Sequence, residues 1–175
     1  MRTSVFWRCA ACLVVLSILS FAEDARAITL RIATDQMVPY EDLQDSAAPG
    51  FSTEVIRAVL ESMKMDYTFS SYPWARSLQM VYSGDVDALY SAFWSAERAQ
   101  KCLFPREPLI HGEWVFFIRK ADVGLLKFNS YDDLIGKRIG ALNGAAISPE
   151  FWAFAKTHHT VELGTFDEQN FKKLG

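Results

Sequence analysis

The sequence is poor in the residues that form disulfides or bind metals. It contains three cysteines and three histidines among 175 residues. Cys9 and Cys12 lie in a leader that we expect to be removed, so Cys102 is left without a partner and no internal disulfide is predicted. His158 and His159 are neighbours whose side chains point apart on most backbones, which predicts a solvated loop rather than a metal site. We therefore expect neither a metal nor another cofactor.

Catalytic motifs and excess positive charge are also missing. The chain has no Gly-x-Ser-x-Gly, His-Glu-x-x-His or Walker sequence, and the spacing of its glycines does not match a dinucleotide fingerprint. These absences argue against an enzyme, so no catalytic residue is assigned. The formal net charge is -3, which argues against nucleic acid as a partner.

The first residues have the features of an export signal. Arg2 and Arg8 accompany an apolar stretch over 10–21, and residues 25–27 end it with a small-x-small pattern. A membrane anchor is the rival interpretation, but a spanning helix needs roughly 20 apolar residues, more than this stretch has. We predict a cleaved signal peptide over 1–27 and a periplasmic mature protein.

Strand and helix patterns alternate over the first part of the mature chain. Strands are predicted at 29–34, 67–71 and 86–92. Apolar residues at helical spacing predict a helix capped by Ser52 or Thr53, with a buried face of Val55, Ile56, Val59, Leu60 and Met63. A second helix should run from Pro73 to a left-handed end at Gly84. This order predicts an α/β fold with a largely parallel sheet and a site at the strands' carboxyl ends.

The alternation restarts after Lys120, which predicts a second lobe. The apolar run WVFFI at 114–118 is a strong strand signal just before that point. Beyond it we expect a short helix at 131–134, a strand at 137–142, a helix at 149–156, a strand at 160–163 and a helix at 166–174.

Four stretches together give a specific resemblance, although each is weak by itself. They are LRIATD (30–35) before the Pro-Tyr pair at 39–40, GFSTE (50–54), SGDVD (83–87) leading to SAER (95–98), and YDDLIGK (131–137) followed by GALNG (140–144). In this order they resemble the family 3 extracellular solute-binding proteins, which feed ABC importers. The resemblance implies a periplasmic-binding-protein-like two-lobe fold of type II, with lobe 1 over 28–117 and lobe 2 over 118–175. It also implies further strands after Gly175, so we expect the second lobe to be incomplete.

The resemblance assigns candidate ligand-binding residues. Arg98 matches the arginine that binds the ligand's α-carboxylate, and a guanidinium fork fits a carboxylate well. A surface ion pair with Glu97 or Asp87 is its alternative role. Asp35 matches an aspartate that can receive the ligand's ammonium group, and its alternative role is to cap a turn.

Aromatic residues are expected to cover the ligand. Tyr40 and Phe51 fall near positions where the family uses aromatic rings for this purpose. Core packing is equally consistent with Tyr40, and Trp74 fits the cleft and the core equally well. The family's usual glycine and hydroxyl residues before the arginine are replaced by Ser91 and Phe93, so the cleft should be more aromatic.

The sequence departs from the family a second time at the start of the helix that follows Gly144. Ala146 stands near the position where the family often has a threonine that helps to hold the carboxylate. The backbone amides remain but the hydroxyl is gone, so an aromatic, larger or non-amino-acid anion is also consistent with the sequence.

These features predict a non-enzymatic, monomeric periplasmic protein that captures a small polar or anionic, amino-acid-like solute for an ABC transporter permease. The alternatives are a ligand-sensing ectodomain of a signalling protein or the binding module of a cell-wall enzyme. A dehydratase-like enzyme of the same fold, with Asp35 or Glu113 as general acid or base, has less support.

The export signal generates a first testable prediction. When the gene is expressed in a Gram-negative host, the protein should accumulate in the periplasm with Ile28 as its first residue, because the signal peptidase recognises the small residues at 25 and 27. Edman sequencing or intact mass measurement of the periplasmic fraction checks this. Recovery of the protein from the membrane fraction with Met1 still present would contradict it.

Overall fold

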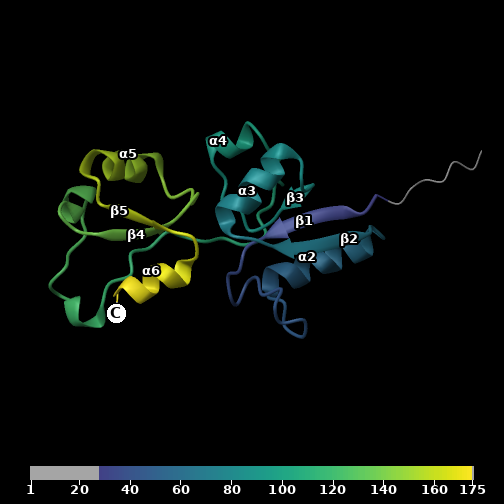
Figure 1. Cartoon of the computed structure of the whole chain (residues 1–175), viewed down its shortest axis with the longest axis horizontal. Coiled ribbons are helices and arrows are strands. Elements are labelled where there is room, and N and C mark those ends of the chain that lie inside the picture. The colour runs from purple at the N-terminus through teal and green to yellow at the C-terminus, as the bar shows by residue number, and fades with distance from the viewer. Residues whose placement is uncertain (1–27, 175) are drawn as a thin grey trace, which may run out of the picture.

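The computed structural model describes residues 28–174, and the predicted signal peptide lies outside them. Figure 1 shows two groups of elements, each built on its own sheet. We call the group around strands β1 to β3 the first lobe and the group around β4 and β5 the second lobe. No helix within 28–174 combines the length and the apolar character needed to cross a bilayer.

The first lobe is a parallel three-stranded sheet with helices on both faces. Its strands are β1 (Leu30–Thr34), β2 (Tyr67–Ser71) and β3 (Ala88–Leu89), in the spatial order β2-β1-β3. Parallel neighbours require crossover connections, and α2 (Phe51–Ser62) and α3 (Trp74–Ser83) provide them on opposite sides of the sheet (Figure 1). A short helix, α4 (Ala96–Ala99), follows β3.

The second lobe contains a two-stranded parallel sheet. Its strands are β4 (Ile139–Leu142) and β5 (Val161–Gly164), and the helices α5 (Pro149–His158) and α6 (Asp167–Leu174) follow them. Short 3₁₀ helices occur at Lys120–Asp122 (η1) and Tyr131–Leu134 (η2). Ser148 begins α5, since its side chain accepts a hydrogen bond from the backbone N–H of Phe151 at 3.0 Å.

Local patterns predicted the type and order of most elements correctly. Trp74 is the first residue of α3, after Pro73, and Gly84 ends the helix in a left-handed conformation with φ 79°, as expected. The predicted strand at 86–92 is shorter, because β3 covers only Ala88–Leu89. The boundary between lobes after residue 117 stays a prediction.

The start of α2 differs from the prediction. Neither Ser52 nor Thr53 caps the helix; both are fully buried inside its first turn, which begins at Phe51. Gly50 precedes it with φ 93°, and a Cβ atom there would lie 2.3 Å from the carbonyl oxygen of Tyr40. Only glycine permits both this backbone conformation and this close approach, so the entry to α2 depends on steric fit rather than on a side-chain cap.

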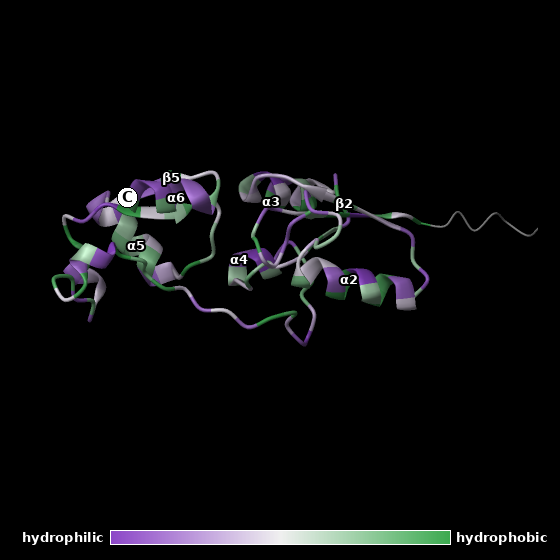
Figure 2. Ribbon diagram, turned by 90° about the horizontal axis from the view of Figure 1, so that it is seen from below, coloured by the Kyte–Doolittle hydropathy of each residue, from purple (hydrophilic) through white to green (hydrophobic). Residues whose placement is uncertain are grey.

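The predicted strand at 114–118 is absent. Residues 111–119 form an extended connection between the lobes, in which hydrophobic and hydrophilic segments alternate (Figure 2). A strand requires a hydrogen-bonding neighbour, and β2 and β3, the edge strands of the first sheet, pair only with β1. Within 28–174 no sheet edge pairs with this connection, so its β propensity is not realised.

The core of the first lobe lies between α2 and the sheet. Ile32, Leu60 and Tyr90 form its buried centre, and partly buried residues such as Ile56 and Phe69 pack around them. The buried face of α2 is narrower than its apolar pattern predicted. Val59 and Met63 are exposed, and only Leu60 and Ile56 of the predicted face belong to the core cluster. In the second lobe, Phe151 and Phe154 of α5 are buried.

Leu60 and Val59 provide a matched test of this packing. Leu60 is 8% exposed and Val59 is 48% exposed, although they are neighbours on the same helix. Leu60→Ala should lower the free energy of unfolding by about 2 to 5 kcal/mol, because it leaves a cavity in the core. Val59→Ala should change it by less than about 0.5 kcal/mol. Urea denaturation followed by circular dichroism measures both values, and equal losses would show that α2 does not pack as described.

Candidate functional site

The carboxyl ends of the two parallel sheets face the junction between the lobes. Asp35 follows β1, and Gly144 lies just after β4. Ligand sites in open α/β sheets form at this end of the strands, because the loops that leave the strands there converge. In this chain two such ends meet, so side chains from both lobes can reach one site.

Arg98 lies at this junction and is 5% exposed. One guanidinium nitrogen, Nη1, donates to the carbonyl oxygen of Phe93 at 2.6 Å, and Nη2 donates to the carbonyl oxygen of Gly144 at 2.8 Å. The guanidinium carbon also lies 5.2 Å from the centre of the Trp74 ring. Arg98 therefore contacts the first lobe, the second lobe and an aromatic face at the same time.

The guanidinium group of Arg98 has no carboxylate partner among residues 28–174. The two alternatives considered for it are both engaged elsewhere, since Asp87 pairs with Arg31 at 2.8 Å and Glu97 lies 3.8 Å from Lys101. Burial lowers the pKa of Arg98, which nevertheless stays charged at neutral pH. A buried cation whose contacts are neutral carbonyl groups favours an anion in its neighbourhood.

Trp74 connects the lobes from α3. Its side chain is buried, and its indole Nε1 donates to the carbonyl oxygen of Gly144 at 3.1 Å. Trp74 is thus a buried packing residue that also contacts the second lobe, and its contact with a solute stays a prediction. Ala146 follows in the same second-lobe loop and is partly buried.

Acidic side chains gather on the other side of the junction. Asp35 is buried and forms no ion pair within the described residues. Burial, followed by the charge of Glu41, raises the pKa of Asp35 to about 6, and Asp167 adds to this effect. Glu41 is fully buried, and burial raises its pKa, while a hydrogen bond from the Ser91 hydroxyl opposes the rise.

Ser91 adopts a left-handed backbone conformation with φ 59°. Its hydroxyl group donates to the carboxylate of Glu41. A non-glycine residue in this conformation costs about 1 kcal/mol or more, and the bond to Glu41 offsets part of that cost. Ser91 therefore supports Glu41 and reaches the acidic side of the junction.

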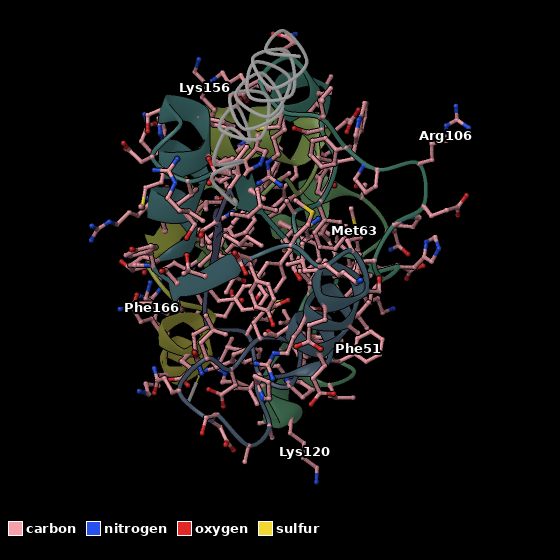
Figure 3. All side chains as sticks on the ribbon, turned by 90° about the vertical axis from the view of Figure 1, so that its right-hand side faces the viewer. Phe51, Met63, Arg106, Lys120, Lys156 and Phe166 are labelled. Atoms are coloured by element: carbon pink, nitrogen blue, oxygen red, sulfur yellow. The ribbon has the colours of Figure 1, made fainter. Side chains whose placement is uncertain are left out.

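The remaining aromatic candidates are more open. Tyr40 and Phe51 are partly exposed where the chain enters α2, and Figure 3 shows Phe51 at the edge of the molecule. Phe93 is also partly exposed and packs against Trp114, with 5.1 Å between the ring centres. These three rings lie on the first lobe and are open to solvent. Their contact with a solute stays a prediction.

Comparison with known proteins agrees with this arrangement. The sequence model of the bacterial extracellular solute-binding proteins, family 3, matches residues 30–164. The chain belongs to this family. The predicted resemblance is thereby confirmed, while a search of curated proteins gave no match.

Solved structures confirm the periplasmic-binding-protein-like α/β fold of this family 3 protein. A histidine kinase sensor domain with similarity to periplasmic binding proteins has a TM-score of 0.64 at 21% identity, covering 85% of this chain and 64% of that one. The arginine-, lysine-, histidine-binding protein ArtJ from Geobacillus stearothermophilus has a TM-score of 0.63 at 19% identity, covering 84% and 62%. The ancestral amino acid-binding protein AncCDT-1, a precursor of cyclohexadienyl dehydratase, has a TM-score of 0.62 at 16% identity. That match covers 92% of this chain and 69% of AncCDT-1.

The family 3 chain spans less than two thirds of the length of the sensor domain and of ArtJ. Within 28–174 no group of three or more histidine, cysteine, aspartate or glutamate side chains is arranged to hold a metal ion.

Two acidic residues of the junction were missed from the sequence. Glu41 follows Tyr40 in the loop between β1 and α2, and its hydrogen-bond partner Ser91 is 50 positions further on. Asp167 belongs to the first turn of α6, where an acidic residue is expected on any helix because it stabilises the helix dipole. Neither position carries a local signal that separates it from an ordinary surface carboxylate.

The acidic side of the junction predicts a specific pH dependence. A carboxyl group with a raised pKa binds its proton more tightly in the folded state, so the free energy of unfolding should fall as the pH rises from about 4 to 6 and remain low above that range. The pKa of about 6 for Asp35 implies that Asp35→Asn raises stability at pH 7 by about 1 to 3 kcal/mol and flattens this profile.

Chemical denaturation at a series of pH values measures the effect. Asp132→Asn, which changes an exposed carboxylate of the second lobe, serves as the control and should leave the slope unchanged. An Asp35→Asn protein that is no more stable than the wild type at pH 7 would contradict the prediction.

Proposed function

We propose that this family 3 protein captures a small polar or anionic, amino-acid-like solute between its two lobes in the periplasm and delivers it to an ABC transporter permease. The observation that carries the proposal is the buried guanidinium of Arg98. It lies at the junction of the lobes and has no carboxylate partner among residues 28–174. A bound carboxylate would supply the missing negative charge through a bidentate contact.

The surrounding residues complete the proposed site. Asp35, at the carboxyl end of β1, is the candidate to receive a cationic group of the solute, and Ser91, two residues after β3, donates to the neighbouring acidic residue Glu41. Trp74 forms a wall beside Arg98, and Ala146 lies in the second-lobe loop that contacts Arg98. Tyr40, Phe51 and Phe93 offer aromatic surface to the body of the solute.

The proposed protein binds its solute without converting it and works as a monomer. The chain carries no catalytic motif, and the buried groups at the junction have the properties that recognition of a zwitterion requires. The neighbours named for binding arginine, lysine and histidine support an amino-acid-like solute.

A sensory role is the second candidate, because a histidine kinase sensor domain is among the structural neighbours. The two roles predict different continuations of the gene. A stop codon about one lobe after the codon for Gly175 supports the transport receptor, whereas a membrane helix followed by a kinase domain supports the sensor. Sequencing the genomic locus separates them.

Replacement of Arg98 tests recognition of the anion. A thermal-shift screen of the twenty L-amino acids and simple dicarboxylates first identifies a solute, and calorimetry then measures its affinity. Arg98→Ala should weaken binding by about 2 to 5 kcal/mol, as expected when one partner of a buried charge pair is removed. Arg98→Lys should recover only part, because an ammonium group lacks the planar fork.

Arg106 provides the matched control. It is exposed and projects away from the body of the molecule (Figure 3), so Arg106→Ala should bind as the wild type does. Unchanged affinity in an Arg98→Ala protein whose circular dichroism spectrum is native would show that Arg98 has a structural role instead.

A further inference from the structure

The hydrogen bonds between the two lobes all end on one atom. Among residues 28–174, the bonds that cross from the first lobe to the second are donated by Trp74 Nε1 at 3.1 Å and by Arg98 Nη2 at 2.8 Å. Both are accepted by the carbonyl oxygen of Gly144. No salt bridge among these residues joins the lobes. The hydrogen bonding that closes the lobes therefore depends on a single acceptor.

The connection at 111–119 adds no backbone hydrogen bond to this closure. Over 111–118 its backbone bonds to no other backbone group of the described chain, and it lies outside both sheets. Trp114 packs on Phe93 of the first lobe, whereas Phe116 packs on Phe128 of the second lobe with 4.9 Å between the ring centres. Extended backbone between them keeps its torsional freedom, so the lobes can rotate about it once the bonds to Gly144 break.

The loop that carries Gly144 is fixed inside the second lobe. The backbone N–H of Asn143 donates to the carbonyl oxygen of Gly164 at 2.9 Å. Trp152 of α5 donates through its indole Nε1 to the carbonyl oxygen of Ala145 at 3.2 Å. These bonds hold the loop on both sides of Gly144, so its carbonyl group approaches α3 as part of a rigid lobe.

The same contacts cover the guanidinium group of Arg98. Its side chain is buried, Nη1 is bound to the Phe93 carbonyl and Nη2 to the Gly144 carbonyl, and the Trp74 ring lies beside it at 5.2 Å. Both donors and the acceptor that join the lobes belong to the chain, so this closure needs no solute. A carboxylate forms a stronger, charge-assisted hydrogen bond than a neutral carbonyl group, and it can replace the Gly144 carbonyl once the lobes have opened.

We propose that Trp74 and Arg98 form a latch on the Gly144 carbonyl group, which closes the lobes without a solute and keeps Arg98 covered until the latch releases. This inference rests on the proposed function, in which Arg98 pairs with the anionic end of the solute. Trp74 is a positioning residue in the latch, because it acts through Gly144. The fraction of molecules whose latch is released then limits the apparent affinity for the solute.

Modification by phenylglyoxal measures release of the latch in the absence of any solute. This reagent reacts with accessible guanidinium groups, and mass spectrometry of proteolytic peptides compares Arg98 with the exposed Arg106 in the same sample. In the wild type, Arg98 should react at least about tenfold more slowly than Arg106, because reaction requires the open form. Trp74→Phe keeps an aromatic ring but removes one hydrogen bond, so the rate at Arg98 should rise about two- to tenfold.

Trp152 supplies the matched control for Trp74. Its indole also donates to a carbonyl group, but both residues of that bond belong to the second lobe. Trp152→Phe removes a similar hydrogen bond without touching the contact between the lobes, so the rate at Arg98 should stay within about twofold of the wild-type rate. An increase equal to that of Trp74→Phe would show general loosening of the protein and would overturn the proposal.

Distances between spin labels measure the opening of the lobes directly. Ala58→Cys on α2 and Lys156→Cys on α5 place the labels at exposed positions in a Cys102→Ser background, and pulsed electron resonance gives the distance distribution. Arg98→Ala removes the bond with the charged donor, so the ratio of open to closed molecules should rise about tenfold or more. This variant decides the matter if circular dichroism shows that Trp74→Phe does not fold. A distribution that Arg98→Ala leaves unchanged would overturn the latch.

The latch and the proposed function fail separately, because neither measurement contains a solute. Wild-type protein in which Arg98 reacts as fast as Arg106 would overturn the latch, while calorimetry on the Arg98→Ala protein would still decide the recognition of the anion. Slow reaction at Arg98 that Trp74→Phe accelerates, in a protein whose affinity for its solute does not depend on Arg98, would retain the latch and reject the proposed role of Arg98.

Discussion

The arrangement of the lobes depends on the hydrogen bonds that the carbonyl oxygen of Gly144 accepts. It accepts hydrogen bonds from the indole of Trp74 and from the guanidinium of Arg98, so one second-lobe atom joins two first-lobe elements. A hydrogen bond to a charged group stabilises by about 1.5 to 3 kcal/mol, more than a neutral one. Residue 144 has φ 82°, a backbone conformation that favours glycine, and a Cβ atom there would also lie 3.2 Å from the Leu78 side chain of α3.

This contact also sets the charge pattern of the junction. Arg98 is fixed on one side by the Phe93 and Gly144 carbonyls, and Ser95 begins its helix by accepting a hydrogen bond from the Arg98 backbone N–H at 3.2 Å. The carboxylates of Asp35 and Glu41 lie on the strand side, held by β1 and by Ser91. Positive and negative groups are therefore separated on rigid elements, and a solute with both charges has one favourable orientation.

The sequence predicted what depends on near neighbours in the chain. The parallel sheet, the end of α3 at Gly84 and the burial of Leu60 follow from periodicity and turn chemistry. The prediction of a strand at 114–118 was wrong, because a strand also needs a hydrogen-bonding partner and the periodicity of a sequence does not show whether one is present. Nothing in the sequence pointed to the burial of Glu41 for a related reason, since its partner Ser91 is 50 positions away. Arg98 was assigned to the site only through the family resemblance, because its own neighbourhood in the sequence favoured a surface ion pair.

The separation of Arg98 from Glu41 indicates what the junction is organised to do. Both side chains are buried in the same chain, and direct pairing would satisfy each of them. Instead the guanidinium is bound to two carbonyl groups and the carboxyl group of Glu41 accepts from the Ser91 hydroxyl, so neither group is paired with an opposite charge. Such an arrangement lowers the stability of the empty protein relative to a paired alternative. Under the proposed function, an anion that pairs with Arg98 would restore that stability only in the bound state, which would couple its affinity to closure of the lobes.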